Sequence, residues 1–90
     1  MRQIGKRKVA SVNTLRDLRP GQSGIVTHLD VSGQLKRRLI DMGITPGVRI
    51  FVRKEAPLGD PIEINLRGYE LSIRKADAQN IKIIMVKEGA

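Results

Sequence analysis

Residues 48–74 read VRIFVRKEAPLGDPIEINLRGYELSIR, and apolar and polar side chains alternate in three successive runs within them. Successive side chains of a β-strand point to opposite faces of the sheet, so each run predicts a strand with one face in the core and one in water. Arg67-Gly68 is a tight turn between the last two runs, and Gly59 lies in a Pro-rich loop over 57–61. The segment therefore predicts three antiparallel strands with short connections.

The flanking residues add two further strands and one helix. Residues 24–29 are rich in β-branched side chains, and residues 81–83 alternate like the central runs. A short amphipathic helix is expected over 33–42, because Gly43 suits a left-handed C-cap and apolar side chains recur at helical spacing. These apolar side chains are Leu35, Leu39 and Met42. Single helical turns are expected around 15–18 and over 76–79.

Together these elements predict a mainly β fold. Five short strands in so small a chain hide their edges best by curling into a barrel. We therefore expect an SH3-like five-stranded antiparallel barrel with one short helix after the first strand. An OB-type barrel is the rival, although its helix usually lies between the third and fourth strands.

Length and charge set the domain organisation. The chain has 90 residues, enough for one domain, and 17 basic against 9 acidic residues give it a net charge of +8. Half of that excess comes from four basic residues, with no acid, among the first eight. We expect a basic flexible arm over 1–13 and one domain over 14–87. Such an arm can bind nucleic acid or an anionic membrane, or can simply be solvated.

The composition argues against catalysis and against a built metal site. The chain has no cysteine and one histidine, His28, whereas a ferrous facial triad takes two histidines and a carboxylate. It has neither a nucleophile-elbow motif nor a phosphate-binding P-loop motif. We therefore expect no enzyme, no cofactor and no metal ligand, with His28 on the outer face or rim of the first strand. Without a targeting or membrane-spanning segment, a cytoplasmic location is expected.

Two features stand out as candidate binding surfaces. One is the basic run Lys36-Arg37-Arg38, which is either a binding site for an acidic partner or a solvated helix face. Within this run, Arg38 lies nearer the apolar side chains of the helix and could pair with Asp41. The other is an apolar groove between the helix and the 57–61 loop. With so few aromatic residues, recognition of Pro-rich peptides is not expected. The candidate partner-binding residues are Leu35, Lys36, Arg37, Met42, Leu58 and Asp60.

Four motifs, in order and with natural spacing from about residue 14 to residue 86, resemble one known family, the FeoA family. They are Leu15-x-x-Leu18-x-Pro20-Gly21, Arg38-Leu39-x-x-Met42-Gly43-Ile44-x-Pro46-Gly47, Pro57-Leu58-Gly59-Asp60-Pro61-Ile62 and Arg67-Gly68-Tyr69-Glu70-Leu71-Ser72-Ile73-Arg74. The resemblance implies an SH3-like barrel that acts as a small cytosolic accessory protein of bacterial ferrous iron transport. It also implies a partner, the membrane permease FeoB, which carries a cytosolic GTP-binding domain.

The leading hypothesis is therefore a binding module, docking through the 33–42 helix and the 57–61 loop onto the cytosolic part of the permease and modulating it. Two other functions stay open. A basic barrel could bind nucleic acid through the arm and residues 36–38, and a metal-responsive regulatory domain could use His28 in a site shared between copies. The oligomeric state also stays open, since a short edge strand can pair between copies.

Overall fold

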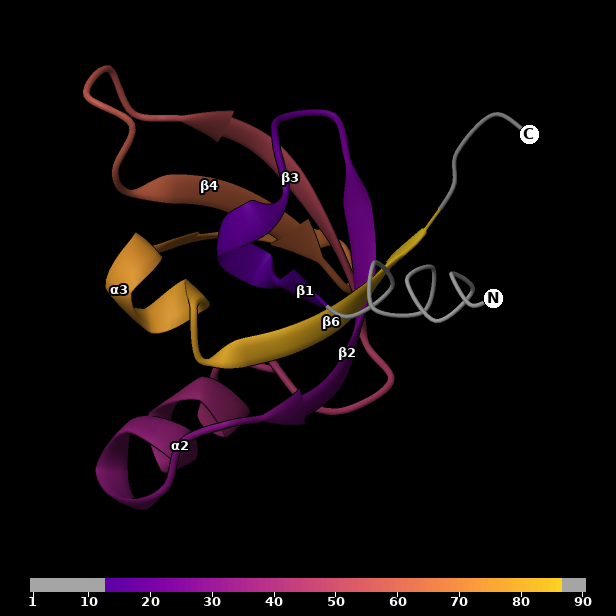
Figure 1. Ribbon diagram of the computed structural model, residues 1–90, viewed down its shortest axis with the longest axis vertical. Coiled ribbons are helices and arrows are strands. Elements are labelled where there is room, and N and C mark those ends of the chain that lie inside the picture. Colours follow the sequence, from indigo (N-terminus) through magenta and orange to yellow (C-terminus); the bar gives the residue numbers. More distant parts are fainter. Residues whose placement is uncertain (1–12, 87–90) are drawn as a thin grey trace, which may run out of the picture.

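The computed structural model describes residues 13–86, and within that range the chain forms six strands and three short helical segments (Figure 1). The strands are β1 Asn13–Thr14, β2 Ser23–Leu29, β3 Arg49–Glu55, β4 Ile62–Leu66, β5 Tyr69–Ile73 and β6 Ile81–Val86. The helical segments are η1 Leu15–Asp17, α2 Gly33–Asp41 and α3 Lys75–Ala78. Apart from Asn13, the basic arm expected at the N-terminus lies outside the described residues.

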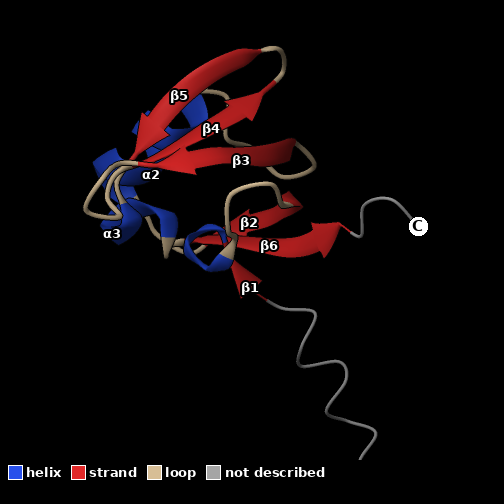
Figure 2. Cartoon of the chain, turned by 90° about the horizontal axis from the view of Figure 1, so that it is seen from above, coloured by secondary structure: helices blue, strands red, loops and turns tan. Residues whose placement is uncertain are grey.

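The described strands form one antiparallel sheet in the order β1-β6-β2-β3-β4-β5. Figure 2 shows the sheet curled, with β3, β4 and β5 in one half and β1, β2 and β6 in the other. β2 joins the halves, because it pairs with β6 along its whole length but with β3 only over Ser23–Ile25. Its register with β6 shifts between Val26 and His28, and such a bulge bends a strand and increases its twist.

The inner face of the curled sheet carries the core. β4 shows the alternation expected from its sequence, with Ile62, Ile64 and Leu66 fully buried and Glu63 and Asn65 only partly so. The other buried apolar residues come from nearly every element, and they are Leu15, Leu18, Val26, Leu29, Leu39, Ile44, Val48, Ile50, Val52, Ile73, Ala78, Ile81 and Ile83. Removing this apolar surface from water is the main force that holds the sheet in its curled form.

Most elements lie where the sequence predicts them. The mainly β antiparallel fold, the helix and the two single helical turns are confirmed, but the described chain has a sixth strand beyond the five expected. This strand, β1, is only two residues long, and Asn13, expected in the arm, pairs with Ile83 of β6. Two residues are too few to show an alternating pattern, so the sequence carries no signal for it.

The end of α2 is fixed to the sheet at Gly43. This glycine has φ +96°, the left-handed conformation expected for a helix C-cap. The Tyr69 hydroxyl of β5 donates a hydrogen bond of 2.8 Å to the backbone carbonyl of Met42. A Cβ at position 43 would lie 2.6 Å from that hydroxyl oxygen, so only glycine leaves room for the contact. The bond holds α2 in a set orientation against the barrel.

Candidate functional site

The structure places the six candidate residues in two groups. Figure 1 shows α2 at one end of the long axis of the molecule and the connection between β3 and β4 at the other. Leu35, Lys36, Arg37 and Met42 belong to the first end, and residues 57–61 to the second. The expectation of one groove shared by the helix and the loop is therefore wrong. The sequence indicates both segments as candidates, but no pattern in it indicates how far apart they lie in the fold.

The side of α2 that faces the core and the side that faces solvent carry different side chains. Leu39 is fully buried, and Leu35 and Met42 are half-buried against the core, so these two candidates contribute mainly to packing. The outward side presents Gly33, Lys36, Arg37 and Ile40, which line an open groove of about 310 Å³. Ile40 is 42% exposed although it is a large apolar residue. We call these four residues the α2 groove.

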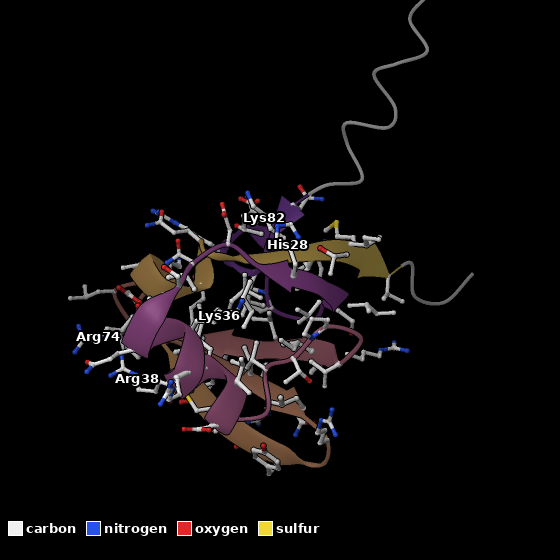
Figure 3. The ribbon with its side chains drawn as sticks, turned by 90° about the horizontal axis from the view of Figure 1, so that it is seen from below. His28, Lys36, Arg38, Arg74 and Lys82 are labelled. Atoms are coloured by element: carbon white, nitrogen blue, oxygen red, sulfur yellow. The ribbon has the colours of Figure 1, made fainter. Side chains whose placement is uncertain are left out.

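The cations of α2 are exposed, and within residues 13–86 none of Lys36, Arg37 and Arg38 forms an ion pair. The pairing of Arg38 with Asp41 that the sequence suggested is not formed. The sheet behaves differently, since Arg53 pairs with Glu70 at 3.0 Å and also with Glu63. Figure 3 shows Lys36 and Arg38 projecting from α2. With three cations and one acid, Asp41, α2 therefore carries a net positive charge and no ion pair.

At the other end, the candidate residue Leu58 is 97% exposed. The loop that carries it is tightly closed, because the Gly59 amide donates to the Ala56 carbonyl at 2.7 Å and the Ala56 amide to the Pro61 carbonyl at 2.9 Å. Leu58 is thus presented to solvent on a well-defined loop.

Asp60, on the same loop, has a structural contact. Its carboxylate accepts a hydrogen bond of 2.9 Å from the backbone amide of Lys75, the first residue of α3. The residue at the N-cap position, Arg74, makes no side-chain cap, so Asp60 satisfies an amide that the helix leaves open. The Lys75 ammonium also pairs with Glu55 at 3.4 Å. These contacts tie the loop to α3 rather than to α2.

One surface was missed by the sequence reasoning. On the outer face of the sheet, Ile25, Phe51 and Ile84 are between 39% and 48% exposed, and Ile25 lies directly opposite Ile84 in the register of β2 and β6. Met85 is also 39% exposed at the end of β6. A sequence signal was present, because Ile83-Ile84-Met85-Val86 breaks the alternation and so puts apolar residues on both faces.

The described residues offer no metal-binding cluster: among residues 13–86, no three His, Cys, Asp or Glu side chains come together. His28 is exposed on β2, as expected, and lies opposite Lys82 of β6, as Figure 3 shows. None of the helices in residues 13–86 is long and apolar enough to cross a membrane.

The chain is similar to known proteins in both sequence and structure. The FeoA domain family model matches residues 13–85. A Porphyromonas gingivalis (strain ATCC BAA-308 / W83) protein, the Fe(2+) transport protein A/Fe(2+) transporter FeoB fusion protein, is 29% identical over 76 residues, covering 84% of this chain. The chain spans only 9% of that relative's length. Among solved structures, the FeoA-like protein of Clostridium acetobutylicum matches with a TM-score of 0.81 and 32% identity, over 89% of this chain and 93% of that chain.

A further solved structure bears on the fold. FeoA of Stenotrophomonas maltophilia, solved in complex with zinc and described as a prokaryotic SH3 domain protein, matches with a TM-score of 0.67 over 78% of this chain and 87% of that chain. At 22% identity it shows the fold alone, and it confirms the SH3-like prediction. The family model covers nearly all of the described residues, and the chain belongs to the FeoA domain family.

Proposed function

We propose that this chain is a non-enzymatic accessory protein of ferrous iron transport. In this proposal it works in the cytoplasm, docks on the cytosolic GTP-binding part of an FeoB-type permease, and modulates it. The observation that carries the proposal is the Porphyromonas gingivalis relative, in which an Fe(2+) transport protein A and an Fe(2+) transporter FeoB form one fusion protein.

The fusion supports docking for a physical reason. Two modules on one polypeptide meet at a high effective concentration, so their contact can be weak. A domain of this family that is not tethered in this way needs a surface of its own that binds the transporter. The exposed cations of α2 and the exposed Leu58 are our two candidates for such a surface within the described residues.

Modulation adds a second requirement. A bound protein shifts its partner's equilibrium only by the difference between its affinities for the two states of that partner. The accessory chain must therefore bind the permease more tightly in one nucleotide state than in another. Its own described residues contribute binding surface to this effect, and no side chain is assigned a catalytic step.

The test uses the full chain and the full-length permease reconstituted in lipid nanodiscs, with empty nanodiscs as the control. We expect binding at micromolar concentration to the loaded discs alone, with dissociation constants that differ several-fold between GDP and a non-hydrolysable GTP analogue. Absence of binding to the loaded discs contradicts docking. Equal affinity in both nucleotide states contradicts modulation but leaves docking in place.

A further inference from the structure

The cations of α2 have no structural explanation within the described chain. Lys36, Arg37 and Arg38 pair with no carboxylate there, whereas Arg53, Lys75 and Lys82 each have at least one within 4 Å. Arg38 lies in the last turn of α2, where a cation favours the helix, but Lys36 and Arg37 lie before that turn and gain little from the helix dipole. Lys36 and Arg37, exposed and without an ion pair in the described chain, are therefore available to an external anion.

The α2 groove combines these charges with an apolar contact. Gly33, Lys36, Arg37 and Ile40 follow the spacing of neighbours on one helix face, and they line the same open groove of about 310 Å³. Ile40 is 42% exposed between the cations, and a Cβ added at Gly33 would meet nothing within 4 Å. The groove therefore offers an apolar spot flanked by positive charge and room for a bulky side chain above it.

The surface chemistry favours a protein partner over a nucleic acid. Single-stranded nucleic acids are bound by stacking their bases on aromatic side chains, and the chain's two aromatic residues, Phe51 and Tyr69, lie on β3 and β5 rather than on α2. The phosphates of a duplex would contact the cations but would leave the exposed Ile40 without an apolar partner. An exposed isoleucine gains most from an apolar side chain. Carboxylates around such a side chain would meet Lys36 and Arg37, which is the complementarity that steers protein association.

We propose that the α2 groove binds an acidic segment of the permease's cytosolic part, with an apolar side chain on Ile40 and carboxylates at Lys36 and Arg37. This inference rests on the proposed docking function and adds to it the face used and the chemistry of the partner. It adds to the binding surface Ile40 and Gly33, which the sequence alone did not indicate. Leu35 and Met42 are not part of this surface, because they pack against the core.

The experiment measures affinity of the full chain for permease-loaded nanodiscs over a series of salt concentrations. We expect the double variant Lys36→Glu/Arg37→Glu to bind at least tenfold more weakly and to lose most of the salt dependence. The charge-matched control is Arg19→Glu/Lys54→Glu, which changes two exposed cations away from α2 and should bind within twofold of wild type. Ile40→Ala should weaken binding several-fold at every salt concentration.

Circular dichroism establishes that each variant is folded, which is expected because the altered side chains are exposed. If wild type binds and the α2 double variant binds equally well, the inference is wrong while the docking function stands. If the control variant loses as much affinity as the α2 double variant, the binding depends on the overall charge of the chain, and the α2 groove is not the binding site. If duplex DNA binds the chain more tightly than the permease does and the α2 variant abolishes that binding, the groove serves a nucleic acid instead.

Discussion

Gly43 shows how a single residue can set the position of a functional surface. Its left-handed backbone ends α2, and its missing side chain leaves space for the Tyr69 hydroxyl to bond the Met42 carbonyl. The first of these roles was predictable, because a glycine after a helical apolar pattern is a local signal. The contact with Tyr69 was not, because it joins β5 to a helix end 27 residues earlier.

Replacing Gly43 by alanine should destabilise the fold by about 2–3 kcal/mol, since a left-handed alanine costs ~1 kcal/mol or more and the displaced tyrosine loses a hydrogen bond worth ~1 kcal/mol. Urea denaturation measures the difference. Gly21→Ala is the matched control, because Gly21 has nearly the same φ, +92°, but nothing within 4 Å of an added Cβ. Equal losses at the two positions would show that the tyrosine contact adds nothing.

At the scale of the elements, the strands were predictable and their arrangement was not. Alternation along β3, β4 and β5 is a local property, so it shows in the sequence directly. Register shifts interrupt the sheet between Val26 and His28 and between Val52 and Lys54, and such bulges bend strands, but nothing in the residues there marks a bulge. The curl of the sheet sets α2 apart from the 57–61 loop, which explains why a single groove was expected and two surfaces are found.

The β4–β5 hairpin offers a test at this scale. Its two turn residues, Arg67 and Gly68, both have positive φ, at +49° and +87°, as a two-residue hairpin turn prefers. Asparagine tolerates that conformation and β-branched residues do not. Arg67→Val should therefore lower the unfolding free energy by about 1 kcal/mol, and Arg67→Asn should leave it unchanged or raise it slightly. Thermal unfolding compares the two, and a valine variant as stable as wild type would contradict the assigned turn.

At the scale of the whole molecule, the two candidate surfaces lie at opposite ends, as Figure 1 shows. A partner that contacts both must reach around the barrel or present two separate sites. The residues of the α2 groove and Leu58 share no contact, and well-separated sites contribute additively to a binding free energy. The two surfaces can therefore be tested independently.

Leu58→Asp is the variant for the second surface. Because Leu58 is 97% exposed, its replacement should change the unfolding free energy by less than about 0.5 kcal/mol. We expect it to weaken binding to permease-loaded nanodiscs, and its effect should add to that of Lys36→Glu/Arg37→Glu in the combined variant. Unchanged affinity would remove the loop from the interface, and a combined loss far from the sum would show that the two ends act together.

The position of β6 has a mechanical consequence. This last described strand lies between β1 and β2, with backbone partners on both sides, rather than at an edge of the sheet. Its ladder with β2 runs along the whole strand, whereas β1 pairs only with Lys82 and Ile83. Tension along the axis of β6 would load the β2–β6 ladder in shear, so that several hydrogen bonds would have to break together. Tension across the strand would instead open the ladder one bond at a time. A pull along the strand axis is therefore resisted by the whole β2–β6 ladder rather than by one bond at a time.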